Sequence, residues 1–375
     1  MIAVRLKQLR LALGLSLDDL AARAGGIVTK QALSKYERGR MAPSPSVLTR
    51  LAGALGVKSV HLMQAPKAEF AFLGFRRKSS LGVRERTSLQ HRLVYELEKR
   101  IRLCTLMSHT LPPTLPLHMY RVSRPDDAER AAERLRRLWK LGSAPISNLI
   151  QVIESKCIHV LILKAREEFD GISATGSVRD PKFTVAAVVV REGLSGERQR
   201  FSLAHELGHL VIRPGRACDV EKAAHRFAGA FLAPAEAVRD LVGKHRANLV
   251  PQELFLLKRH FGMSIAAVLY RLRDLEIIGA TEYRAWCIYI SSHGWRRSEP
   301  EPIPPEEPQW MKQTAVRANA EGFISTEEAE HYSGQSLERT KPGSRITPRE
   351  LLRMPPEQRR RIVEESVAGL RGVAK

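Results

Sequence analysis

The chain has 375 residues, enough for two or three domains, and its 43% apolar content is ordinary for a globular protein, which argues against a disordered or fibrous chain. Its formal net charge of +21 favours a polyanionic partner, most simply nucleic acid, although a solvated basic surface would carry the same charge. The four cysteines form no CxxC pair, and no apolar run reaches the ~18 residues that a membrane span needs, so we expect a cytoplasmic protein without a membrane partner.

Residues 1–66 have the pattern of a compact helical domain. Ser16 is a suitable N-cap, and a glycine-containing turn leads to a short helix over residues 29–37, with Leu33 and Tyr36 facing inward. The outward face of this helix carries hydrogen-bond donors, the arrangement that a DNA major groove accepts. These outward residues are Thr29, Lys30, Gln31, Ser34 and Lys35.

The stretches "LR…LGLS…LAARAG", "TKQALSKYERG" and "LTRLAGALGV" resemble the Xre/Cro helix-turn-helix family over residues 1–63. The resemblance implies that Lys30, Gln31 and Lys35 approach base edges of double-stranded DNA with Ser34 nearby, and that Thr29 contacts phosphate. It also implies an ion pair between Arg10 and Glu37. Such modules usually bind two half-sites as a homodimer. The alternative is a helical bundle used only for protein contacts.

We expect residues 67–124 to form a helical connector. Its main feature is the long helical pattern "RTSLQHRLVYELEKRIRLCTLM" at 86–107, which "LPPTLPLH" then ends.

Residues 125–280 mix helical and strand patterns. "IHVLILKA" and "KFTVAAVVV" read as buried strands, and the intervening "EFDGISATGSVRD" as a loop. Helical patterns follow at 198–213, 219–232 and 252–278.

The helix at 198–213 contains the pattern HExxH. Residues four apart share a helix face, so His205 and His209 can bind one metal ion, while Glu206 is placed to act as a general base on a water molecule. The next helix offers Glu221, which shares a face with two small residues, Ala224 and Ala228. Glu221 could complete a His₂Glu zinc set, or it could be a solvated acid at a helix start.

"GERQRFSLAHELGHLVI" followed by "EKAAHRFAGAFLAP" resembles the ImmA/IrrE family of metallopeptidases, and the resemblance extends over about 125–280. It implies a gluzincin-like, zinc-dependent endopeptidase that acts on repressor proteins. Members of this family are often fused to an Xre-type domain.

The resemblance also implies roles for one further residue and one strand. His225 stands where the family usually has asparagine. We favour an orienting role in which it accepts the N–H of a ligating histidine, and the alternatives are a competing ligand or a surface histidine. The strand Phe183–Val190 would pair with extended substrate, or would simply be a buried strand.

Residues 281–375 form a C-terminal extension. It contains a Pro/Glu-rich linker at 296–308, which is too poor in apolar residues to pack, and a basic helical tail from about 344.

The expected fold is multi-domain and mainly α with a small β-sheet: an all-α helix-turn-helix bundle, followed by an α+β gluzincin-like metallopeptidase domain. The leading hypothesis is a DNA-binding regulator whose zinc endopeptidase domain cleaves a repressor or antitoxin-like protein, or the chain itself. The alternative is a repressor or antitoxin whose HExxH domain only binds a partner or senses a signal.

Overall fold

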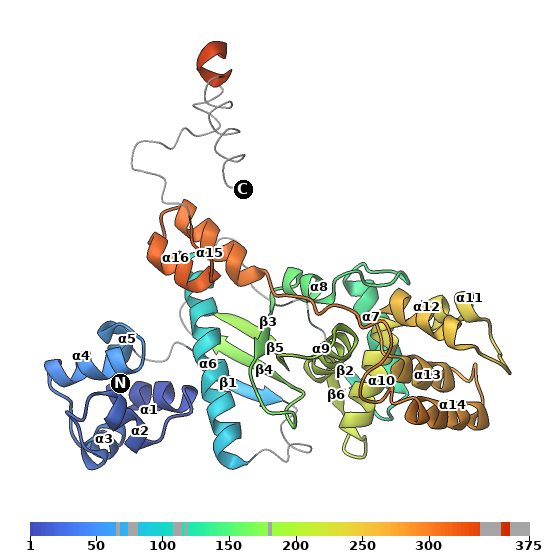
Figure 1. The fold of residues 1–375 in the computed structure, drawn as a ribbon, viewed down its shortest axis with the longest axis horizontal. Coiled ribbons are helices and arrows are strands. Elements are labelled where there is room, and N and C mark those ends of the chain that lie inside the picture. The colour runs from blue at the N-terminus through green and yellow to red at the C-terminus, as the bar shows by residue number, and fades with distance from the viewer. Residues whose placement is uncertain are drawn as a thin grey trace. The chain divides into compact units, whose positions relative to one another are not determined.

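The computed structural model describes residues 1–64, 68–73, 82–107, 115, 117, 119–178, 182–337 and 354–360. The chain forms two compact units, Met1–Thr314 and Ala315–Lys375 (Figure 1). The architecture agrees with the predicted fold class, with helices predominating around a small four-stranded sheet.

The N-terminal domain is a bundle of five helices. They are α1 (Ile2–Ala12), α2 (Leu17–Arg23), α3 (Lys30–Glu37), α4 (Pro45–Ala54) and α5 (Ser59–Met63). Ser16 caps α2 by accepting a hydrogen bond from the backbone N–H of Asp19, and Thr29 caps α3 in the same way through the N–H of Ala32. Leucines from successive helices form the core, where Leu6, Leu20 and Leu33 are completely buried.

The sheet has four strands in the order β1-β4-β5-β3. They are β1 (Ala68–Leu73), β4 (Gly171–Val178), β5 (Phe183–Arg191) and β3 (Ile158–Leu163). β4 is antiparallel to both its neighbours, and β5 and β3 are parallel. A second, two-stranded pair joins β2 (Tyr120–Val122) to β6 (Ile212–Pro214).

Two predictions need correction here. The stretch read as a loop, "EFDGISATGSVRD", contains β4, because pairing on both sides outweighs the weak strand propensity of its Gly, Ser and Ala residues. The predicted helical connector contains strands β1 and β2 beside its helix, so residues 67–124 contribute to the sheets.

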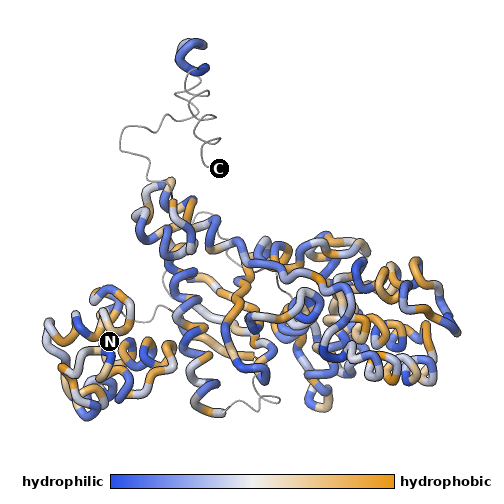
Figure 2. Tube along the Cα trace, in the orientation of Figure 1, coloured by the Kyte–Doolittle hydropathy of each residue, from blue (hydrophilic) through white to orange (hydrophobic). Residues whose placement is uncertain are grey.

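One face of the sheet is covered by the long helix α6 (Val83–Leu106), which Figure 1 shows crossing the strands. Leu89, Leu93, Leu97 and Ile101 recur every four residues and pack against alternate residues of β3, β4 and β5. Figure 2 shows hydrophobic strands beside a mostly hydrophilic α6, as expected for a helix that buries one narrow stripe. The same stretch of α6 also contacts α1, where Arg5 and Gln8 donate hydrogen bonds to Glu98.

Helices cover the other face of the sheet and continue into the main core. They are α7 (Asp127–Leu138), α8 (Leu149–Ser155), α9 (Gly196–Val211), α10 (Val220–Leu232), α11 (Ala235–Val242), α12 (Pro251–Phe261), α13 (Ile265–Asp274) and α14 (Ala280–Ser292). α9 lies against the sheet, and α10 packs beside α9. The fully buried Arg271 of α13 crosses this core and donates a 2.7 Å hydrogen bond to Glu129 of α7.

The Pro/Glu-rich segment is packed, contrary to the prediction that it has too few apolar residues to do so. Glu299 accepts a 3.0 Å hydrogen bond from the buried Lys258, and Glu306 pairs with Arg200. The backbone of Ile303 and Pro304 lies so close to Gly196 that a Cβ there would overlap the carbonyl oxygen of Pro304. Charged and backbone contacts, and not apolar burial, therefore hold residues 299–306 against the start of α9.

After this segment come α15 (Trp310–Ala320) and α16 (Thr326–Ser333). The basic tail predicted from about 344 lies outside the described residues, apart from 354–360. Among the helices described, none is both long and apolar enough to span a membrane.

Candidate metal centre and DNA-binding helix

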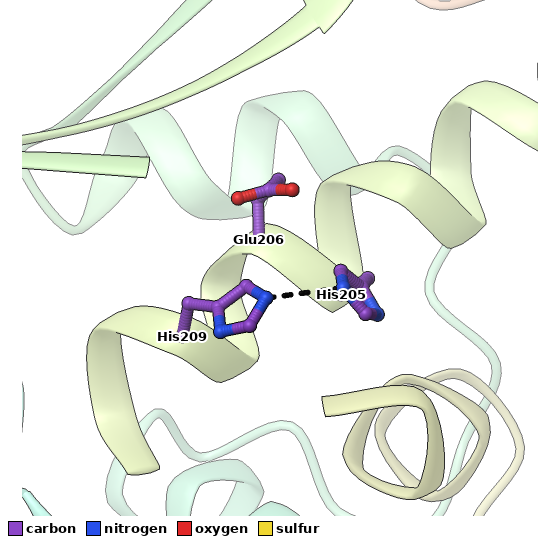
Figure 3. Close-up of side chains that lie close together, drawn as sticks. All are labelled: His205, Glu206 and His209. Carbon is purple, nitrogen blue, oxygen red and sulfur yellow. Dashed lines mark hydrogen bonds between the residues drawn. The ribbon is translucent and has the colours of Figure 1, made fainter. Parts of the chain in front are cut away.

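Helix α9 presents its two histidines on one side, and their Nε2 atoms lie 3.1 Å apart (Figure 3). They are one helical turn apart, which places the two rings on the same face. Glu206 leaves the helix in a different direction, as Figure 3 shows, and its side chain is buried. The three residues of the HExxH pattern thus separate into a histidine pair and a carboxylate beside it.

Glu221 reaches the histidine pair from the first turn of α10. Its carboxylate oxygens lie 3.4 Å from Nε2 of His205 and 3.7 Å from Nε2 of His209. Asp219 caps α10 by accepting hydrogen bonds from the backbone N–H groups of Glu221 and Lys222, which fixes the start of the helix.

The approach of α10 to α9 depends on small residues, as the sequence predicts. A Cβ built on Gly208 would lie 3.1 Å from the ring of Phe227 and 3.4 Å from the Cα of Ala224. A larger side chain at Gly208 would push the helices apart and separate Glu221 from the histidines.

The three side chains fit a divalent metal ion. Ligands held ~2.0 Å from a tetrahedral zinc ion lie about 3.3 Å from one another, close to the three distances observed here. Burial, helped by the neighbouring His205, lowers the pKa of His209 to about 4 against the opposing effect of Glu221. The imidazole is therefore neutral near pH 7, the form that binds metals.

Glu206 is held by strand β4. The Oγ of Ser173 donates a 2.9 Å hydrogen bond to its Oε2, and a Cβ on Gly171 would lie 2.9 Å from its Cγ. Burial raises the pKa of Glu206 to about 8, against the effect of Ser173 and reinforced by Glu221 and Asp170. A cation bound by the histidine pair would favour the ionised carboxylate.

Ser173 and Gly171 were not identified from the sequence, because their segment was read as a loop. The signal available was the run of small residues "GISATGS" between two apolar strands, which permits close approach of a helix.

His225 follows Glu221 by one turn of α10. Its ring centroid lies 4.5 Å from that of His205 and 5.7 Å from that of Phe201. The Nδ1 atom of His205 has no hydrogen-bond partner within the part of the chain that the structure describes. The ring of His225 packs against the ring of His205.

The residues predicted to contact DNA lie on α3 and at its cap. Thr29, Lys30, Gln31 and Lys35 are exposed and Ser34 is half-buried, while Leu33 and Tyr36 face the core. Nζ of Lys30 lies 2.6 Å from Oδ2 of Asp18, a residue of α2.

The predicted ion pair behind this helix is confirmed. Arg10 donates two hydrogen bonds to the carboxylate of Glu37, at 2.6 and 2.8 Å, and a third to the backbone oxygen of Leu15. This bidentate ion pair connects α1 to the C-terminal end of α3.

An N-terminal helix-turn-helix bundle, joined to an α+β domain with HExxH on a buried helix, defines a class of regulator with a peptidase-type domain. The comparisons with known families agree. Residues 6–62 match the family described as "Helix-turn-helix", and residues 169–273 match the "IrrE N-terminal-like domain" of the M78 peptidases. No curated protein matches the chain.

The chain therefore carries an Xre-type helix-turn-helix domain and an ImmA/IrrE-like peptidase domain. The second match begins just before β4 and includes β5, α9 and α10, so it covers the whole candidate metal centre.

Proposed function

We propose that this protein is a DNA-binding transcriptional regulator and a zinc-dependent endopeptidase that cleaves a repressor or antitoxin-like protein, or the chain itself. The observation that carries the proposal is the convergence of two imidazoles and a carboxylate, all of the types that ligate metals, beside a buried carboxylate that hydrogen-bonds strand β4. In this arrangement His205, His209 and Glu221 would hold the ion.

When bound, zinc acts as a Lewis acid that acidifies water and polarises an amide carbonyl. Glu206 is the residue that moves the proton. Its Oε2 accepts from Ser173, which leaves Oε1 to take a proton from water and pass it to the leaving amine. His225 would restrict the ring of His205 by packing against it.

The DNA-binding part of the proposal rests on the exposed face of α3. Lys30, Gln31 and Lys35 would read base edges, Ser34 would lie nearby, and Thr29 would contact phosphate. The hydroxyl of Thr29 accepts from Ala32 and can still donate to a phosphate oxygen. Two copies would bind two half-sites of an operator as a homodimer.

The catalytic proposal is tested by co-expressing the full chain with proteins encoded beside its own gene. Glu206→Gln removes the proton acceptor while keeping the size of the side chain, so we expect cleavage by the unaltered chain and none by the variant. Glu236→Gln, which changes an exposed glutamate on α11, is the matched control.

Equal cleavage by both chains would contradict the catalytic role of Glu206. Partner capture without cleavage by either chain would support the alternative, a regulator whose HExxH domain only binds or senses.

A further inference from the structure

Strand β4 carries the residue that contacts Glu206. One edge of β4 pairs with β5, and the opposite edge pairs with β1, a segment from outside the matched peptidase region. Strand β1 pairs antiparallel with β4 along six residues, from Ala68 opposite Val178 to Leu73 opposite Ser173. Ser173 is the residue that hydrogen-bonds Glu206. The end of β1 therefore lies directly across the ladder from the catalytic carboxylate's own partner.

This placement corrects the expectation that β5 aligns substrate. β5 lies between β4 and β3, and both of its edges are used. An extended peptide can join a sheet only at an edge strand. Without β1, the edge nearest Glu206 would be that of β4.

The β4 edge is shaped for a strand with an aromatic side chain. A Cβ on Gly176 would lie 2.7 Å from the ring of Phe70, so the ring occupies space that any other residue at 176 would fill. Phe70 and Phe72 project to the same face of the ladder and pack against the core under α6. On the opposite face, Leu73 packs against the main core while Ala71 is exposed.

β1 is held less firmly than the strands beside it. None of its residues is fully buried, whereas most residues of β4 and of β5 are buried. Displacing β1 thus costs mainly the packing of three partly buried side chains, Phe70, Phe72 and Leu73, and one ladder of hydrogen bonds. An incoming strand of similar pattern would restore these contacts.

We propose that β1 is an internal competitor for the strand position that a protein substrate takes, and that an extended substrate segment displaces it from β4. The inference rests on the proposed peptidase function. The segment it fits alternates small or polar residues with apolar ones and places an aromatic side chain opposite Gly176, as "AEFAFL" does in β1 itself.

The test uses a disulfide lock and a peptide probe. Ala71 and Thr175 are paired in register and lie on the face away from α6, so the full-length double variant Ala71→Cys, Thr175→Cys can be oxidised to hold β1 on β4. The probe is a fluorescein-labelled peptide of sequence AEFAFL, followed by fluorescence anisotropy. Mass spectrometry checks that the lock has formed and that the peptide stays intact.

A locked β1 leaves almost no accessible β4 edge, so we expect the oxidised protein to bind the peptide at least about tenfold more weakly than the same protein after reduction. The double variant Phe70→Ser, Phe72→Ser weakens β1 and should bind the peptide at least about tenfold more tightly than the unaltered chain. The single variant Ala71→Cys, oxidised and reduced, is the control for effects of the redox treatment.

Equal binding by the locked and reduced proteins would overturn the inference, because the peptide would then add elsewhere, such as to the outer edge of β1. No binding by any form would overturn it as well. Since the readout is binding and not cleavage, a protein that shows lock-dependent binding but cleaves nothing would refute the proposed peptidase activity and leave the competition between strands standing.

Discussion

The Oγ of Ser173 donates a 2.9 Å hydrogen bond to Oε2 of Glu206 and so joins strand β4, in the interior of the sheet, to the HExxH helix α9. Both side chains are buried. Its position on the helix already turns Glu206 away from the histidine pair, and the contact with Ser173 holds the carboxylate there. The proposed division of roles, with metal binding by the histidines and proton transfer by Glu206, depends on this arrangement.

Ser173→Ala should therefore impair catalysis without removing the metal. Losing one hydrogen bond to a carboxylate costs about 1–2 kcal/mol, which corresponds to a fall in kcat/KM of roughly 5- to 30-fold. Metal content, measured in parallel, should be unchanged. Ser155→Ala, at an exposed serine on α8, is the control. A variant with full activity would show that Glu206 does not need this partner.

Glu221→Ala should weaken metal binding strongly. Removing a residue that only orients a ligand typically costs about 10–100-fold in affinity, and the loss of a ligand should cost at least as much. Competition with a chromogenic chelator measures the change.

His225→Phe is the comparison, since phenylalanine preserves the ring packing against His205. We expect this variant to keep its metal. Loss of metal from His225→Phe, with retention by Glu221→Ala, would show that the third ligand is His225.

Residues 299–306 of the Pro/Glu-rich segment should contribute to the stability of the fold through ion pairs with Lys258. Lys258 is fully buried and lies 3.2 Å from Glu197 and 3.0 Å from Glu299. Lys258→Met leaves the buried carboxylate of Glu197 and the partly buried carboxylate of Glu299 without their cation, which should lower the free energy of unfolding by about 3–5 kcal/mol.

Urea unfolding, followed by circular dichroism, measures the change. Adding Glu197→Gln and Glu299→Gln to Lys258→Met should restore part of the loss, whereas Lys244→Met, at an exposed lysine, should have little effect. Equal stability of Lys258→Met and the unaltered chain would mean that the ion pairs with Lys258 are not needed to hold the segment.

His159 should make the fold sensitive to acid. Burial, with Arg100 as a smaller contribution, lowers the pKa of His159 from its ordinary value of 6.5 to about 3. Between these values the unfolded chain binds a proton that the folded chain does not. Consequently His159 leaves the free energy of unfolding at its full value above pH 6.5, and that free energy decreases as the pH falls from 6.5 toward 3.

The contribution of His159 to the slope of unfolding free energy against pH approaches about 1.4 kcal/mol per pH unit within that window. His159→Leu should flatten the slope by about this amount between pH 5 and 6 in urea titrations, whereas His245→Leu, at an exposed histidine, should not. Identical slopes for His159→Leu and the unaltered chain would indicate that His159 is protonated in the folded state.

Asp18 should restrain DNA binding. Asp18 forms an ion pair with Lys30, whose ammonium group is proposed to contact DNA, so the two interactions compete. Both side chains are more than half exposed. Asp18→Asn should raise affinity for DNA from the region upstream of the protein's own gene by roughly two- to fivefold. Lys30→Ala with Lys35→Ala should weaken DNA binding by about 1–3 kcal/mol for each base that the removed side chain reads.

Fluorescence anisotropy at fixed salt measures these affinities, with Lys244→Ala as the control for loss of net charge. DNA binding that is unchanged in the Lys30→Ala, Lys35→Ala protein would place the recognition surface elsewhere.

Local pattern was enough to predict a compact helical N-terminal domain, its cap at Ser16, its helix over residues 29–37 and the two site helices. The apolar spacing, caps and small residues that indicate them all lie within a few residues of one another. The HExxH spacing likewise predicts which two side chains converge. The ion pair of Arg10 with Glu37 followed from the family resemblance and is present.

What the sequence did not predict depends on partners distant along the chain. Strand β4 is weak in strand propensity and exists because β1 and β5 pair with it. Residues 299–306 pack because Lys258 and Arg200 supply charges that no local apolar pattern could reveal. Ser173 was missed for the same reason, since its role requires knowing that β4 faces α9.

Zinc content of the purified full-length protein tests the central claim most directly. By inductively coupled plasma mass spectrometry, the unaltered chain should contain close to one zinc ion per chain, and the double variant His205→Ala, His209→Ala almost none. The double variant His245→Ala, His293→Ala, which changes two exposed histidines, should match the unaltered chain. Equal zinc in the unaltered chain and the His205→Ala, His209→Ala protein, or no zinc in either after purification with zinc present, would contradict the account.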